Sequence, residues 1–160
     1  MENRTTPPPI TIDPSKRYSV TVRTSRGDFV MQLVDAKVAP QTVNNFVYLA
    51  QNGFYRGLTF HRVVPGFVVQ GGDPSGDGTG GPAYKLPDET NESRWPRGTV
   101  GMASSAAGVS GSQFFITLGD APFLADNGVY NHFAEVTSGM DVIDKIKVGD
   151  TMTSLDVTAT

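Results

Sequence analysis

The fold of this chain is decided by one stretch, FHRVVPGFVVQGGD, which spans Phe60–Asp73. Two runs of β-forming residues flank a Pro-Gly turn, a pattern that predicts an antiparallel β-hairpin. The first run carries Arg62, and a guanidinium is costly to place on an apolar surface unless another group interacts with it. The stretch therefore predicts both a sheet and a surface on which this cation has a partner.

Two registers of the hairpin can be drawn, and they place the side chains on different faces. A two-residue loop pairs Arg62 with Val69 and turns Gln70 away from the cation. A three-residue loop, residues 65–67, pairs Arg62 with Gln70 and gives the charge an amide neighbour on its own face. We therefore expect the three-residue loop, with Phe67 projecting beside the Arg62 face. That face then also holds Val64 and Val68, and the core face holds Val63, Val69 and Gly71.

A second unusual run, GSQFFIT, spans Gly111–Thr117. Strand periodicity places Gln113 and Phe115 on one side of the strand and Phe114 on the opposite side. If the first pair joins the Arg62 face, the surface becomes an apolar pit rimmed by one cation and two amides. It offers no paired acid and base, so it suits binding an apolar group beside a peptide carbonyl better than it suits hydrolysis.

Composition places the chain among single-domain globular proteins. It has 160 residues, of which 38% are hydrophobic and 18% charged, enough for one domain with a core. Eighteen glycines and eleven prolines predict many turns, and hence β-rich structure. The net charge of −3 and the lack of a basic stripe argue against a nucleic-acid partner. No segment is apolar and long enough to span a bilayer, so we expect a cytoplasmic protein without a membrane partner.

The sequence also excludes several kinds of site. The chain has no cysteine, which excludes disulfides, zinc thiolate sites and thiol catalysis. The glycine-rich stretch 71–81 lacks the Lys-Ser/Thr ending of a phosphate-binding loop, and Tyr84 stands where a calcium loop needs Glu. We interpret this stretch as a tight surface loop and expect no metal and no cofactor. His61 and His132 lack a convincing carboxylate partner, and both are expected to be structural.

Sequence patterning divides the chain into a proline-rich flexible arm, residues 1–16, and a single domain, residues 17–160. Apolar residues with a period of 3.6 predict helices at 40–52 and at about 139–147. Eight antiparallel strands close well into a barrel, whose ends two short helices can cover. We therefore predict a mainly β fold, a closed eight-stranded antiparallel β-barrel capped by two α-helices. The eight predicted strands lie near 18–23, 29–33, 59–64, 68–71, 99–103, 113–118, 131–136 and 154–158.

The motifs taken together resemble the cyclophilin-type peptidyl-prolyl cis-trans isomerases, and bacterial members in particular. The resemblance extends over about 18–146 and implies the same capped barrel. It implies an enzyme that rotates X-Pro peptide bonds and so assists protein folding, with proline-containing peptides and unfolded chains as partners. It requires no cofactor, and we expect a monomer. The motifs, in order, are Phe60–Asp73, Gly78–Gly81, Gly101–Ala103 and Gly111–Ile116.

The resemblance also implies a role for individual residues. Arg62 is implied as the catalytic residue, and Gln70 as the partner that holds it in place. The residues implied in substrate binding are Phe67, Val68, Ala103, Ser104, Ser105, Gln113, Phe115, Phe123, Leu124 and Tyr130.

A few positions depart from the family pattern. Val68 stands where many members have Met, which shortens one wall of the proline pocket. Ser104 replaces the usual Asn, which changes one contact to the substrate backbone. Phe123 and Tyr130 stand where eukaryotic members commonly carry Trp and His. Because Phe123 has no indole N–H, we expect only weak cyclosporin binding.

Two other function classes stay open at this point. A binding module with the same fold would use Arg62 only to hold proline-containing segments. The joint presence of Arg62, Gln70 and Phe115 favours the enzyme. A serine hydrolase built on Ser112 is disfavoured, because the Gly-Ser-Gln sequence around it lacks the nucleophile-elbow pattern.

Overall fold

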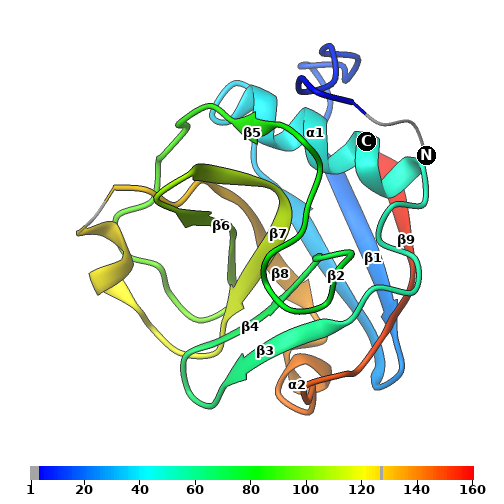
Figure 1. The fold of residues 1–160 in the computed structure, drawn as a ribbon, viewed down its shortest axis with the longest axis vertical. Coiled ribbons are helices and arrows are strands. Elements are labelled where there is room, and N and C mark those ends of the chain that lie inside the picture. The colour runs from blue at the N-terminus through cyan, green and yellow to red at the C-terminus, as the bar shows by residue number, and fades with distance from the viewer. Residues whose placement is uncertain (1–3, 127) are drawn as a thin grey trace.

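The computed structural model describes residues 4–126 and 128–160 (Figure 1). Among these residues the regular elements are one antiparallel sheet, two α-helices and one short 3-10 helix. The strands are β1 (Tyr18–Thr24), β2 (Gly27–Leu33), β3 (Phe60–Val64), β4 (Val68–Gly71), β5 (Lys85–Leu86), β6 (Thr99–Ser105), β7 (Gly108–Thr117), β8 (His132–Ser138) and β9 (Met152–Ala159). The helices are α1 (Pro40–Gln51), the 3-10 helix η1 (Pro122–Ala125) and α2 (Met140–Ile143).

The sheet contains the N-terminal hairpin that the alternation of apolar residues predicts. β1 and β2 are antiparallel, with Val20 opposite Met31 and Val22 opposite Phe29. All four side chains are buried, because side chains two positions apart on a strand share one face. The sequence pattern therefore fixes which side of this hairpin faces the core.

The sheet is strongly curled but open, so the predicted closed barrel is wrong. Its longer strands follow the order β3-β4-β7-β6-β8-β2-β1-β9, and the short β5 pairs with β7 (Figure 1). In the described residues, the end strands β3 and β9 form no continuous ladder; they are linked near one end by an isolated bridge between Thr59 and Thr151 and by a few backbone hydrogen bonds around it, such as Phe60 N–H to the Asp150 carbonyl. A turn at residues 147–150 precedes β9 beside this bridge. The Asp150 N–H donates to the Lys147 carbonyl within it, and Gly149 has a positive φ of 94°.

Helix α1 lies across one end of the curled sheet (Figure 1). Its observed bounds match the predicted 40–52 closely, and Pro40 occupies the first turn, where a missing N–H costs nothing. The free N–H groups of Gln41 and Thr42 donate to the carboxylate of Glu89, at 3.0 and 2.8 Å. The apolar side chains that the helix buries are Val43, Phe46, Val47, Leu49 and Ala50.

Helix α2 is shorter than the predicted 139–147. Beyond it the N–H groups of Lys145 and Ile146 bond to carbonyls three residues back, which continues the chain in tight turns instead of a second α-helical turn. Ile143 and Ile146 are buried, whereas Met140 is only half-buried against the inner core. Neither α-helix, nor any other helix of the described residues, is long and apolar enough to cross a membrane.

Buried apolar side chains form two clusters. The inner core lies between α1 and the concave face of the sheet and includes Phe46, Phe114 and Phe133. The outer cluster is smaller, and β4 and β7 each contribute one side chain to it. The buried members of the outer cluster are Val68, Trp95, Phe115, Ala121 and Leu124.

The N-terminal segment contacts α1 through Asn44. The Asn44 side chain accepts hydrogen bonds from the N–H groups of Thr11 and Ile12 and donates to the carbonyl of Pro8. Ile12 is buried against the inner core. Residues 1–3 of the predicted arm lie outside the described residues, and the flexibility of the arm stays a prediction.

Candidate active site

The β3–β4 hairpin adopts the register with a three-residue loop. Arg62 lies opposite Gln70, and Val64 lies opposite Val68. Arg62 Nη1 donates a hydrogen bond to Gln70 Oε1 at 3.2 Å. The predicted register is confirmed, and the charge shares the outer face of the sheet with its amide partner.

Strand β7 places neighbouring phenylalanines on opposite faces of the sheet, as its period predicts. Phe114 packs in the inner core, with its ring centroid 5.6 Å from those of Phe46 and Tyr55. Phe115 lies opposite Gln70 of β4 and packs in the outer cluster. The second predicted run therefore joins the Arg62 face, as expected.

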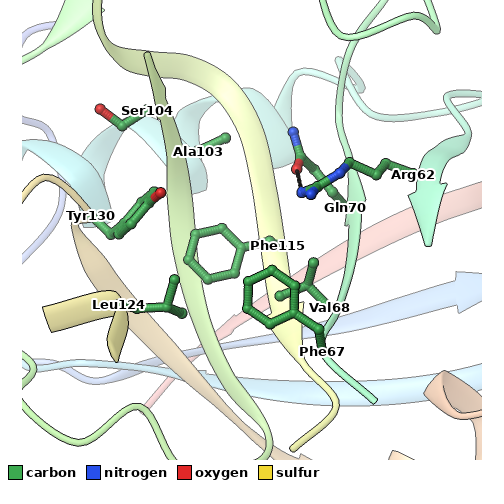
Figure 2. A pocket seen from close by; sticks show the side chains of 9 residues that line it. All are labelled: Arg62, Phe67, Val68, Gln70, Ala103, Ser104, Phe115, Leu124 and Tyr130. Atoms are coloured by element: carbon green, nitrogen blue, oxygen red, sulfur yellow. Dashed lines mark hydrogen bonds between the residues drawn. The ribbon is translucent and has the colours of Figure 1, made fainter. Parts of the chain in front are cut away.

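The outer face holds a small pocket over the outer cluster (Figure 2). Its cavity of about 170 Å³ is smaller than the roughly 300–1,000 Å³ of pockets for drug-sized ligands, so it suits a compact group. Figure 2 shows the Phe115 ring near the centre, with Leu124 and Tyr130 on one side and Arg62 on the other. The residues that line the pocket are Arg62, Phe67, Val68, Gln70, Ala103, Ser104, Phe115, Leu124 and Tyr130.

Two further predicted site residues, Ser105 and Gln113, line an adjoining groove instead of the pocket. The groove encloses about 340 Å³ and shares Gln70, Ala103 and Ser104 with the pocket. Because the pocket and the groove have these three lining residues in common, they are adjacent, and an extended chain that occupies one can continue into the other.

Phe123 lies outside both hollows. It is 56% exposed, and its ring centroid lies 5.5 Å from that of Phe67 at the pocket edge. Its neighbour Leu124 takes the buried position of η1 instead. Phe123 can therefore act on the pocket only from its rim, and its role in substrate binding stays a prediction.

Sequence reasoning missed Trp95, which supports the pocket from behind. Its buried ring lies 5.4 Å from the ring of Phe115 and 6.3 Å from that of Tyr130. Gly101 makes room for the indole, since a Cβ there would lie 2.6 Å from the Trp95 ring. A signal for this role was present, because the only tryptophan of the chain lies in the polar segment RWPR. Tryptophan is highly buried on average, so one in a polar segment indicates packing against the rest of the fold.

Among the described residues, Arg62 brings the only charge to the pocket lining. In the part of the chain that the structure describes it forms no ion pair, so its remaining donors stay available to the cavity. Burial lowers the pKa of His61 and of His132, and neither ring lines the pocket. His132 bonds instead to the side chain of Asn91, and it lies 3.9 Å from the Glu92 carboxylate, a partner that the sequence did not indicate. The site therefore offers a fixed hydrogen-bond donor beside an apolar hollow.

No metal site accompanies this pocket among the residues described. No group of three or more His, Cys, Asp or Glu side chains lies together within residues 4–126 and 128–160. What the arrangement can do is hold a compact apolar group and donate a charged hydrogen bond beside it.

The chain belongs to the cyclophilin-type peptidyl-prolyl cis-trans isomerases. The family described as "Cyclophilin type peptidyl-prolyl cis-trans isomerase/CLD" matches residues 19–159. A peptidyl-prolyl cis-trans isomerase of Helicobacter pylori is 42% identical, over 90% of this chain and 96% of that protein. The predicted family and its isomerase function are therefore confirmed.

Solved structures agree with this assignment. The crystal structure of a cyclophilin type peptidyl-prolyl cis-trans isomerase from Cryptosporidium parvum has a TM-score of 0.80 and 29% identity, over 90% of this chain and 99% of that one. A structure of the same protein in the presence of the dipeptide Ala-Pro has a TM-score of 0.77 and 28% identity, over 89% and 99% of the two chains.

Proposed function

We propose that this chain catalyses rotation about X-Pro bonds in flexible or unfolded chains, with Arg62 as the catalytic residue. Peptide rotation is slow because resonance gives the C–N bond partial double-bond character, with a barrier of about 18–20 kcal/mol. The cis and trans forms of an X-Pro bond differ by only about 0.5–1 kcal/mol. A catalyst therefore has to lower the barrier and need not move the equilibrium.

Arg62 is suited to act on the transition state. When the peptide bond is twisted, the prolyl nitrogen becomes pyramidal and gains a localised lone pair. Arg62 can donate a hydrogen bond to that lone pair, and the planar ground state offers no such acceptor, so the interaction is differential. Gln70 supports this role because its Oε1 accepts a hydrogen bond from Arg62 at 3.2 Å. No proton transfer or covalent intermediate is needed.

The pocket and groove suit the two sides of the X-Pro bond. The compact cavity over Phe115 and Leu124 suits the proline ring, and the groove past Ala103 suits the residues before it. The related Cryptosporidium protein was solved in the presence of Ala-Pro, which supports a proline-containing ligand for this fold. We propose that the ring stays fixed in the pocket while the acyl side of the bond turns.

Several properties of the chain outside the reaction are also proposals. The net charge of −3 supports protein segments over nucleic acid as partners. Phe123 has no indole N–H and lies at the pocket rim, which supports weak cyclosporin binding only. A monomeric state and a cytoplasmic location stay predictions.

The position of Arg62 beside an apolar hollow carries this proposal, and an exchange measurement tests it. We expect the wild type to accelerate cis-trans exchange of a short Ala-Pro peptide, followed by NMR exchange spectroscopy. The Arg62→Ala variant is expected to lose about a hundred- to a thousandfold of that acceleration, the loss typical for one donor of a preorganised site. Exchange at the uncatalysed rate in both proteins, with the peptide still bound, would indicate a binding module instead.

The mechanism also predicts a flat pH profile. A guanidinium stays protonated from about pH 6 to 9, and the mechanism uses no other titrating group, so turnover should hardly change over this range. Rates measured at several pH values check this expectation. A steep bell-shaped profile would require a general acid or base and would contradict it.

A further inference from the structure

Arg62 lies at one end of a hydrogen-bonded relay that begins in the glycine-rich loop after β4. Gln70 accepts a hydrogen bond from Arg62, and its Nε2 donates to Gln113 Oε1 at 3.1 Å. Gln113 Nε2 in turn donates to the carbonyl oxygens of Gly78 and Gly80, at 3.1 and 2.9 Å. Two amides therefore connect the catalytic cation to the backbone of a loop that does not line the proline pocket.

The loop carbonyls determine which way both amides point. A carbonyl oxygen only accepts hydrogen bonds, so the NH₂ group of Gln113 must face the loop and its oxygen must face Gln70. Gln70 then has to present its own NH₂ group to Gln113 and its oxygen to Arg62. If Gln70 turned over, its NH₂ group would face the guanidinium and Arg62 would lose its acceptor. If Gln113 turned over, its NH₂ group would face that of Gln70, and Gln70 could regain a partner only by turning its oxygen away from Arg62.

The Asp73 side chain stabilises the conformation of this loop through hydrogen bonds to its backbone. It is 1% exposed, and its carboxylate accepts hydrogen bonds from the N–H groups of Ser75, Asp77 and Gly78, at 2.8, 3.1 and 2.5 Å. Burial alone would raise the pKa of the Asp73 carboxyl group. The hydrogen bonds from the backbone N–H groups, which also include that of Gly80, have the larger combined effect, so the pKa is lowered. The carboxylate is therefore ionised, and charged acceptors make the stronger hydrogen bonds.

The packing around this carboxylate leaves the loop little freedom. A Cβ on Gly80 would lie 2.1 Å from Asp73 Oδ1 and 2.4 Å from Ser75 Oγ. The backbone that carries the Gly80 carbonyl therefore wraps closely around Asp73, and the carboxylate fixes where that carbonyl points.

We propose that Asp73 is a positioning residue for catalysis. Its carboxylate fixes the direction of the Gly78 and Gly80 carbonyls, and these carbonyls orient the amides of Gln113 and Gln70. The amides then hold Arg62 in the position from which it donates. The inference rests on the proposed catalytic role of Arg62, but the relay itself can be observed without turnover.

The Asp73→Asn variant tests this inference, because it keeps the size of the side chain and removes the charged acceptor. We expect kcat to fall about tenfold while the KM for an Ala-Pro peptide stays within about twofold, since misplacing a group acts on the transition state. We also expect the side-chain amide resonances of Gln70 and Gln113 to shift in ¹⁵N NMR spectra of the folded variant.

Glu89→Gln is the matched control. Glu89 also uses a carboxylate to accept backbone N–H groups, those of Gln41 and Thr42 at the start of α1, and it takes no part in the relay. This variant is expected to lower the free energy of unfolding while it leaves kcat and the amide resonances of Gln70 and Gln113 unchanged. Lower stability alone would then not explain an effect at Asp73.

A second variant tests the positioning role of Asp73 if Asp73→Asn does not fold. Gly80→Ala keeps Asp73 but forces the loop backbone away from the carboxylate, so it should reproduce the loss of kcat and the amide shifts. Wild-type kcat and unchanged amide resonances, in a folded Asp73→Asn or in Gly80→Ala, would overturn the inference. An inactive wild type would instead remove the proposed function, and the amide resonances would still report whether the relay exists.

Discussion

The two faces of β7 carry neighbouring phenylalanines in opposite surroundings. Phe114 is fully buried in the inner core, with edge contacts to the rings of Phe46 and Tyr55. Phe115 packs against Trp95 on the outer face and has the open pocket in front of it. One step along the strand therefore separates a side chain that builds the fold from one that builds the site.

The two clusters differ in how completely they are filled. Phe114 is fully buried within the inner core, as expected of a close-packed interior. The outer cluster packs Trp95 behind Phe115 and leaves a cavity of about 170 Å³ in front. Substitutions on the inner face should therefore act on stability, and substitutions on the outer face should act on function.

The largest effect is expected for Phe114→Ala. Removing a fully buried ring from a filled core leaves a cavity, and the free energy of unfolding should fall by about 3–5 kcal/mol. Denaturant unfolding of the variant and the wild type measures this difference. A loss below about 1 kcal/mol would show that the inner face is not the part that holds the fold together.

Phe115→Ala should act in a different way. The ring borders a cavity that is already open, so we expect a smaller loss of stability than for Phe114→Ala. Loss of the contact with the proline ring should raise the KM for an Ala-Pro peptide by roughly ten- to a hundredfold, from the burial energy of one large apolar side chain. Equal losses of stability in the two variants, with an unchanged KM, would remove the distinction between the faces.

The smallest effect is expected on acidification. Burial lowers the pKa of His132, with Glu92 opposing it, so the unfolded chain binds its proton at higher pH than the folded chain. This contribution to the free energy of unfolding is complete above the ordinary pKa of 6.5 and is lost as the pH falls through the lowered value. The free energy of unfolding can be followed at each pH by the fluorescence of Trp95, whose ring lies 5.9 Å from that of His132.

The matched comparison for this prediction is His132→Gln. Between about pH 7 and 5 the variant should lose less of its free energy of unfolding than the wild type, because one group with a shifted pKa is gone. A wild-type stability that rises over this interval would contradict the expected direction of the shift.

The sequence predicts those parts of the molecule in which a wrong arrangement would bury a charge or expose a core residue. Arg62 could pair with Gln70 only in one hairpin register, and the period of β7 assigned Phe114 and Phe115 to opposite faces. These predictions depend on local spacing, and the structure agrees with them. The pocket lining followed from the same spacing together with the resemblance to the family.

The errors and omissions concern features that arise from distant contacts. The closed barrel failed because, in the described residues, β3 and β9 meet only near the Thr59–Thr151 bridge and form no continuous ladder. Trp95 lies outside any periodic element, so no strand or helix pattern pointed to its place behind Phe115. The loop organised by Asp73 looked like an ordinary glycine-rich turn, because its hydrogen bonds to the backbone leave no mark in the sequence.

The most direct test of the central claim separates binding from rotation in the Arg62→Ala variant. The affinity for an Ala-Pro peptide and the cis-trans exchange rate of the bound peptide would be measured on the same sample by NMR, with Arg62→Lys as the variant that keeps the charge. We predict that the affinity of Arg62→Ala changes by less than about fivefold, while exchange slows by about a hundred- to a thousandfold. A parallel loss of affinity and exchange would mean that Arg62 holds the substrate equally in both states, which would contradict the account.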